Sequence, residues 1–135
     1  MLEILNMGEI LRILLVEDNL LNQRIVLFNL KKYNHVITIA NNGLEAVAKF
    51  IEGEYDVILM DIMMPVMDGL EATVKIREVE QFSNTIRRTP IIALTANTMD
   101  NDRNKCISYG MDEFMAKPFD VEKLKAIFTK LDIIH

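Results

Sequence analysis

The stretch VILMDIMMPVMDG, from Val57 to Gly69, places one carboxylate, Asp61, at the end of a four-residue apolar run. A run of this length and composition predicts a buried strand. Burying an ionised carboxylate is costly unless a cation or hydrogen-bond donors meet it. The stretch therefore predicts a strand that ends at a charged group, and Asp61 requires a cationic partner from elsewhere in the chain.

Around this stretch, short apolar runs alternate with longer segments of helical period. The alternation predicts an α/β fold in which parallel strands are covered by helices on both faces. The predicted strands are Arg12–Glu17, Val36–Ala40, Val57–Met60, Ile91–Leu94 and Glu113–Ala116. The predicted helices are Leu20–Lys32, Leu44–Glu52, Leu70–Gln81, Met99–Ser108 and Val121–Leu131.

Several helix boundaries carry local signals. Asn42 and Asp120 are candidate N-caps, and Glu45 stands three residues after Asn42, the spacing of a capping box. Gly110 followed by Met111 predicts a helix end, because glycine adopts the left-handed conformation and the next apolar residue packs back. The apolar positions of the first predicted helix are Leu21, Ile25, Leu27, Phe28 and Leu30.

Length and composition fit one domain of 135 residues, with 50% hydrophobic content for a single core. A net charge of −5 repels phosphate backbones and argues against nucleic acid as a partner. The single cysteine, Cys106, fits a reducing compartment. Charged residues interrupt the apolar N-terminal stretch, so neither a signal peptide nor a membrane span is predicted, and we expect a cytoplasmic protein. Residues 1–9 are either a short native extension or a cloning remnant, and the domain covers 10–135.

Polar side chains stand at the carboxyl ends of four predicted strands. The first strand ends in Glu17 and Asp18, the third in Asp61, the fourth in Thr95 and the fifth is followed by Lys117. In a parallel sheet with helices on both faces, functional groups gather beyond the carboxyl ends of the strands. We therefore expect these five side chains to converge, with Lys117 as the cationic partner of Asp61.

Such a set has a definite chemistry. Crowded carboxylates must be protonated, paired or bound to a cation, and an oxygen-only group with open positions suits Mg²⁺. Lys117 can bind an anion while Thr95 donates a hydrogen bond to it. Together they describe a site for a phosphoryl group, and Asp61 is central enough to be the nucleophile that forms an aspartyl phosphate.

Each residue also has a plainer interpretation. Glu17, Asp18 and Asn19 form a plausible helix cap, and Asp68 with Gly69 is typical of a turn before a helix. Thr95 and Asn97 suit an ordinary loop. We interpret His35 and His135 as solvated, because they are not spaced to form a metal site. The coincidence of polar residues at the same end of several strands favours the functional interpretation.

The fragments VEDN, MDIMMPVMDG, ALTAN and AKPF resemble the receiver domain of two-component response regulators, in the family's order and with its usual separations. The resemblance runs from about Ile13 to Leu131. It implies a flavodoxin-like, doubly wound (βα)5 fold with a five-stranded parallel sheet between two helical layers. VEDNxxN and ALTAN further resemble receivers fused to hybrid sensor kinases.

Residue by residue, the resemblance implies a phosphoacceptor, Asp61, and a Mg²⁺ site. Asp18 would bind the metal directly, Glu17 largely through water, and Asp61 and the carbonyl of Met63 would complete the protein ligands. The phosphoryl oxygens would contact Thr95 and Lys117, and Lys117–Pro118 resembles the family's cis peptide. Thr95 would also form a switch with an aromatic residue three positions before the lysine, Phe114.

The implied donor is a sensor histidine kinase or a histidine phosphotransfer protein. The receiver would catalyse only its own phosphorylation and dephosphorylation, with no membrane partner, and a weak homodimer on phosphorylation is a further expectation. Met63 and Asn97 depart from commonly studied members. Because both positions flank the path of the attacking water, they bear on the lifetime of the phosphoryl group.

Three alternatives remain at the level of sequence. A haloacid-dehalogenase-like phosphatase would need an acid where Met63 stands, and a flavodoxin-like electron carrier would need a hydroxyl- and glycine-rich loop where the chain has EDNLLN. A degenerate receiver that only binds proteins is the closest rival. Such domains usually lack the acceptor or the lysine, whereas Asp61 and Lys117 are both present.

Overall fold

The computed structural model describes residues 10–83, 87–96 and 100–133. Its elements in chain order are β1 (Arg12–Val16), α2 (Leu20–Lys31), β2 (Val36–Ala40), α3 (Gly43–Glu52), β3 (Val57–Asp61), α4 (Gly69–Phe82), β4 (Ile91–Thr95), α5 (Asp100–Ser108), β5 (Glu113–Ala116) and α6 (Val121–Lys130). The expected alternation of strands and helices is confirmed, and boundaries move by about one residue. The 1–9 segment and the predicted helix start at Met99 lie outside the described residues.

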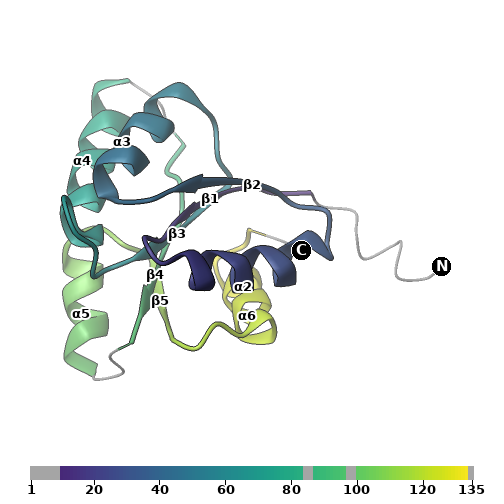
Figure 1. Cartoon of the computed structure of the whole chain (residues 1–135). Helices are drawn as coiled ribbons and strands as arrows, with labels where there is room; N and C mark the ends of the chain where they lie inside the picture. The colour runs from purple at the N-terminus through teal and green to yellow at the C-terminus, as the bar shows by residue number, and fades with distance from the viewer. Residues whose placement is uncertain (1–9, 84–86, 97–99, 134–135) are drawn as a thin grey trace.

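The five strands form one parallel sheet in the order β2-β1-β3-β4-β5. Helices α2 and α6 cover one face, and α3, α4 and α5 cover the other (Figure 1). The connections therefore reverse direction after β2, which leaves β1 and β3 as neighbours at the topological switch point. This arrangement confirms the doubly wound, flavodoxin-like architecture.

The central strands are buried on both faces, which explains why they appear in the sequence as unbroken apolar runs. Every residue of β3 and β4 is buried. Alternate residues of β1 enter different cores: Leu14 packs with the helices α3, α4 and α5, and Leu15 packs with α2 and α6. The two cores fix the sheet rigidly, so the ends of its strands are held in defined positions.

Helix α2 does not bury most of the apolar positions that the sequence singled out. Its buried residues are Gln23, Val26 and Leu30, whereas Leu21 and Phe28 are 67% and 69% exposed. Positions 23, 26 and 30 follow one helical stripe, and the sheet meets this stripe because Val26 and Leu30 join its core. Helix α2 therefore presents a second apolar stripe to solvent.

The expected caps are present with one difference. Asn42 accepts the Glu45 N–H at 2.9 Å, but Glu45 bonds back to the N–H of Asn41 at 3.0 Å and not to Asn42. At the end of α5, Gly110 has φ of 111°, and buried Met111 packs back into the core. The predicted helix stop at Gly110 is confirmed.

A single guanidinium ties together the amino-terminal end of the sheet. The Arg77 side chain on α4 is 13% exposed and forms ion pairs with Glu80 and Asp112, each at 2.8 Å. It also donates to the carbonyl oxygens of Thr89 at 2.8 Å and Gly110 at 2.9 Å. The loops before β4 and β5 are thereby fixed to one helix.

The sequence suggested that His35 is solvated, but the structure shows a half-buried ring. Its ring is half-buried, stacks on Tyr33, and accepts the Leu11 N–H at its Nδ1 atom at 3.0 Å. An imidazole nitrogen that accepts a hydrogen bond carries no proton. Burial lowers the pKa of His35, which agrees with this neutral form. His135 lies outside the described residues.

Within the described ranges, we find no helix with both the length and the apolar character needed to cross a bilayer.

Candidate functional site

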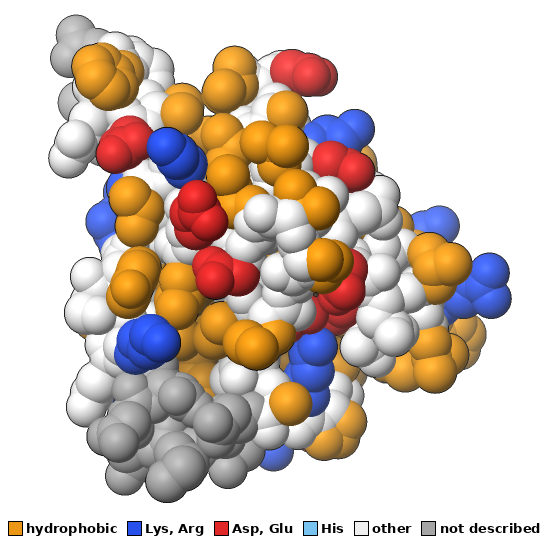
Figure 2. Space-filling model, turned by 60° about the vertical axis from the view of Figure 1, so that its left-hand side comes forward, with side chains coloured by type: hydrophobic (Ala, Val, Ile, Leu, Met, Phe, Trp, Pro, Cys, Tyr) orange, Lys and Arg blue, Asp and Glu red, His pale blue; other side chains and the backbone are white. Residues whose placement is uncertain are grey.

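Three carboxylates converge where β1 and β3 end. Glu17 and Asp18 follow β1, Asp61 closes β3, and one oxygen from each of the three lies within 4.8 Å of the others. Glu17 is 1% exposed and Asp61 is 5% exposed, whereas Asp18 is open to solvent. Figure 2 looks onto this side of the molecule, where red acidic and blue basic side chains meet near the middle of the face. The site therefore has two buried acids and one exposed acid.

Lys117 provides the cation that Asp61 requires. Its Nζ lies 3.2 Å from Glu17 Oε1 and 3.3 Å from Asp61 Oδ2, and its side chain is 26% exposed. Burial lowers the pKa of Lys117, but the carboxylates of Asp61 and Glu17 more than compensate and raise it above its ordinary value. The ammonium thus stays charged at neutral pH. The Lys117–Pro118 peptide is cis, as expected.

The loop after β3 shapes the surroundings of Asp61. The Met63 N–H donates to Asp61 Oδ1 at 3.3 Å, and the Met63 side chain is 78% exposed. At the end of the loop, Gly69 donates to the Ile62 carbonyl at 2.9 Å. A Cβ on Gly69 would lie 2.2 Å from the Asp61 carbonyl oxygen. Only glycine lets α4 begin this close to the acid.

Thr95 and Phe114 lie on neighbouring strands. Thr95 is opposite Ala116 and Ala93 is opposite Phe114, so all four side chains share one face of the sheet. Thr95 is 5% exposed, and its carbonyl accepts the Lys117 N–H at 2.7 Å. The Phe114 ring is only partly buried. Asn97 lies outside the described residues.

Sequence reasoning missed one residue that supports the site. Gln23 on α2 is 6% exposed, and its Nε2 donates to the Glu17 carbonyl oxygen at 2.6 Å and to Asn41 Oδ1 at 2.8 Å. It joins the loops after β1 and β2 and holds the chain that presents the acids. The only signal in the sequence is a polar residue on the same helical stripe as Val26 and Leu30.

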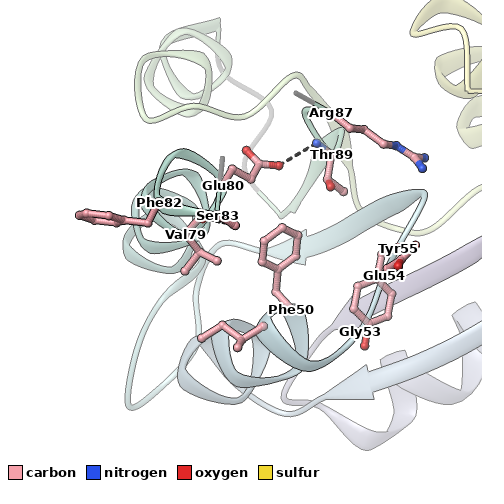
Figure 3. A pocket seen from close by; sticks show the side chains of 11 residues that line it. Phe50, Gly53, Glu54, Tyr55, Val79, Glu80, Phe82, Ser83, Arg87 and Thr89 are labelled. Carbon is pink, nitrogen blue, oxygen red and sulfur yellow. Dashed lines mark hydrogen bonds between the residues drawn. The ribbon is translucent and has the colours of Figure 1, made fainter. Parts of the chain in front are cut away.

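Two pockets lie at opposite ends of the sheet and differ in size. A groove of about 90 Å³ lies beside the acids, between α2 and the loop after β5, and its walls include Ile25, Lys117 and Pro118. A larger pocket of about 690 Å³ lies at the opposite end, where the chain enters β3 and β4. In Figure 3, the Phe50 ring lies in the middle of this pocket, whereas Phe82 extends away from it. Its Glu80 is already bound to the Thr89 N–H at 2.8 Å. Of these two pockets, only the smaller groove is lined by residues of the acidic site, Glu17 and Lys117.

Comparison with known proteins gives a consistent result. The family model described as the response regulator receiver domain matches residues 13–129. Hybrid signal transduction histidine kinase B of Dictyostelium discoideum is 48% identical over 115 residues, which are 79% of this chain and 6% of that protein. The chain thus spans only a small part of this relative.

Solved structures show the same likeness. The receiver domain of a sensor histidine kinase from Pseudomonas aeruginosa, with a magnesium ion in its active-site cleft, is 40% identical with a TM-score of 0.79. This match covers 90% of our chain and 97% of that one. The Saccharomyces cerevisiae receiver of Ssk1, crystallised with the histidine phosphotransfer protein Ypd1, is 33% identical with a TM-score of 0.81, covering 90% and 88%.

Proposed function

Because this chain belongs to the response regulator receiver family, we propose that Asp61 accepts a phosphoryl group from a phosphohistidine in a Mg²⁺-dependent transfer. Receivers of this family act in phosphorelays. One observation carries the assignment of Asp61: this buried acid lies between the other two carboxylates and the Lys117 ammonium. Glu17 has the same neighbours, but Asp61 is the one that closes the central strand β3, and this central position favours Asp61 as the acceptor.

The candidate metal ligands, Glu17, Asp18 and Asp61, fit Mg²⁺. All of its side-chain ligands are carboxylate oxygens, and Asp18 is open to solvent, so water can complete an octahedral shell. We assign Asp18 and Asp61 as direct ligands, Glu17 as a ligand through water, and the Met63 carbonyl as the fourth protein contact. When bound, the ion neutralises charge on the phosphoryl oxygens and on the acids.

The residues of the chain perform the transfer itself. A carboxylate oxygen of Asp61 attacks phosphorus and forms an O–P bond. The N–P bond to the donor histidine breaks, and the ring nitrogen keeps the electron pair and takes up a proton. Lys117 already contacts Asp61, and we propose that it moves to a phosphoryl oxygen while Thr95 donates a hydrogen bond to another. The receiver thus catalyses its own modification. In its dephosphorylation, water attacks the phosphorus, the O–P bond to Asp61 breaks, and inorganic phosphate leaves while Asp61 returns to a carboxylate.

The change at Asp61 reaches the surface through Thr95 and Phe114. If Thr95 moves toward the phosphoryl oxygens, it vacates space on the face that it shares with Phe114. The Phe114 ring is partly exposed at rest, and full burial would gain about 1–2 kcal/mol. Such a gain shifts two states of similar energy about tenfold. We therefore assign Thr95 and Phe114 as the switch.

Hydrogen exchange tests this switch. Adding Mg²⁺ and beryllofluoride, a phosphoryl mimic, should alter amide exchange across residues 100–131 in the natural sequence. Thr95→Ala should abolish the remote change, and Thr95→Ser, which keeps the hydroxyl, should retain it. A remote change that survives in Thr95→Ala would remove Thr95 from the mechanism.

We further propose that the donor protein docks on the exposed stripe of α2. Leu21, Ile25 and Phe28 follow one another at helical spacing and are 67%, 41% and 69% exposed. The groove beside the acids continues this stripe, since Ile25 lines it. Phe28→Ser should slow transfer from a phosphohistidine donor and leave labelling by phosphoramidate unchanged.

The proposal also covers where the protein acts and what it binds. We propose that it acts in the cytoplasm and binds neither nucleic acid nor membranes. We also propose that it forms a weak dimer after phosphorylation.

Mass spectrometry of the intact chain tests the central assignment. Phosphoramidate with Mg²⁺ should add one phosphoryl group, and omission of Mg²⁺ should prevent the addition. Asp61→Asn should abolish the mass increase. Asp56→Asn is the matched control, because Asp56 pairs with Arg12 and Arg87 at the amino-terminal end of the sheet. Stoichiometric labelling of Asp61→Asn would show that another acid is the acceptor.

A further inference from the structure

The loop after Asp61 contains a tight turn centred on a valine. Met67 N–H donates to the Pro65 carbonyl at 2.8 Å, which closes a three-residue turn around Val66. Val66 has φ of 71°. A three-residue turn with a positive φ at its centre is the rare, strained form of the γ-turn, and a β-branched residue is unfavourable there. Glycine would adopt this backbone without strain.

The surrounding structure enforces this turn. The Met67 carbonyl accepts the Gly43 N–H at 2.9 Å, which ties the loop to the start of α3. A Cβ on Gly43 would lie 2.5 Å from that carbonyl oxygen, so the approach depends on glycine. On the other side, the ring of Pro65 fixes its own φ. The strain at Val66 is therefore maintained from both sides, as expected for strain at a functional position.

Packing inside the chain does not explain the valine. Its side chain is 77% exposed, so folding gains little from burying it. The loop sorts its apolar residues: Met64 and Met67 pack on the core, whereas Met63 and Val66 point to solvent. Both exposed side chains, Met63 and Val66, lie in the loop that follows Asp61. A strained and exposed apolar residue at this place is best explained by a contact outside the chain.

We propose that Val66 is a specificity-determining residue that packs, together with the Met63 side chain, against the phosphohistidine-bearing donor protein. The inference rests on the proposed function of Asp61. A donor protein must bring its imidazole to Asp61, so its surface has to meet the loop that begins there. A free small-molecule donor needs no such contact. Val66 thus extends the donor surface beyond α2 to the opposite side of the acceptor.

Two substitutions separate the apolar contact from the strain. Val66→Thr keeps the branched shape and the strained backbone but replaces a methyl group by a hydroxyl. Val66→Gly removes both the side chain and the strain. The control is Val36→Thr, since Val36 is 56% exposed at the start of β2, the end of the sheet away from Asp61. The donors are phosphorylated Ypd1 and phosphoramidate.

We expect Val66→Thr to lower kcat/KM for transfer from phosphorylated Ypd1 about fivefold, mainly through KM, as for loss of one apolar contact in an interface. Val66→Gly should lower it at least as much while raising the melting temperature. Val36→Thr should match the natural chain with both donors. Labelling by phosphoramidate should stay within about twofold in all three variants, because this reaction needs no protein surface.

The outcomes are distinguishable. If the natural chain takes no phosphoryl group from phosphoramidate with Mg²⁺, the proposed function fails. If phosphoramidate labels it but transfer from Ypd1 is absent, or is unaffected by both Val66 substitutions, the docking role of Val66 is refuted. Equal losses with both donors would also refute it, because the turn would then act on the acceptor loop alone.

Discussion

Replacing Lys117 by methionine should strengthen Mg²⁺ binding while abolishing phosphoryl transfer. In the metal-free protein, the Lys117 ammonium lies 3.2 Å from Glu17 and 3.3 Å from Asp61 and neutralises both acids. A metal ion that binds the same acids must displace or be repelled by this ammonium. Methionine has a similar length but no charge, so it removes the competing cation and leaves the acids in place.

The size of the effect follows from the geometry. At an effective dielectric constant of about 20, two unit charges about 3 Å apart attract by roughly 5 kcal/mol, but desolvation cancels most of this gain. For a side chain that is 26% exposed, each of the two contacts retains about 0.5–1 kcal/mol. Their sum of about 1–2 kcal/mol corresponds to Mg²⁺ affinity that is about 5- to 30-fold tighter.

Isothermal titration calorimetry at pH 7.5 measures this affinity directly. Lys130→Met is the matched control, because Lys130 pairs with Glu113 at 2.6 Å and has no contact with the acids. The metal-free Lys117→Met variant should also lose about 1–2 kcal/mol of unfolding free energy, and saturating Mg²⁺ should restore most of it. Unchanged or weaker Mg²⁺ binding in Lys117→Met would show that the ammonium does not compete with the metal.

Three further predictions concern other parts of the molecule. Gly69→Ala should lower the unfolding free energy by about 2–3 kcal/mol in urea titrations, because the new Cβ meets the Asp61 carbonyl; Gly53→Ala, which meets only the Tyr55 ring, should cost far less. Since the pKa of His35 is lowered in the folded chain, its contribution to stability should be complete above pH 6.5, fall as the pH drops toward the lowered pKa, and be missing in His35→Gln. Met63→Asn should shorten the lifetime of the phosphorylated state, followed as phosphate release, because the amide can orient an attacking water; unchanged or slower release would exclude Met63.

The convergence of the acids and the lysine could be predicted because parallel strands point the same way. Once the runs around Asp61 and Thr95 are identified as strands, their ends must meet at one edge of the sheet, whatever the details of packing. The buried face of α2 could not be predicted in the same way. Its sequence offers two apolar stripes, and only contact with the sheet decides that Val26 and Leu30 are buried while Phe28 is exposed.

Other features depend on tertiary contacts that no local pattern records. The role of Gln23 arises because two loops, after β1 and β2, happen to end within reach of one amide. The turn at Val66 contradicts local preference, since only its links to neighbouring segments hold a valine at positive φ. Burial lowers the pKa of His35, and its Nδ1 atom accepts a hydrogen bond from the distant Leu11 N–H. In each case the deciding partner lies in another part of the fold or of the chain.

The contacts of Arg77 have a consequence for how long the folded state lasts. They join residues that are 12, 33 and 35 positions apart in sequence, so closing them requires β4 and β5 to be in place already. Interactions that form late in folding scarcely change the folding rate but slow unfolding. We therefore expect Arg77 to set the kinetic lifetime of the carboxyl-terminal half of the domain. Because the planar guanidinium of Arg77 contacts four partners at once, the ammonium of a lysine could not replace it. In Arg77→Lys, we expect the amino-terminal end of the sheet to unfold faster, while phosphoryl transfer at the carboxyl-terminal end stays unchanged.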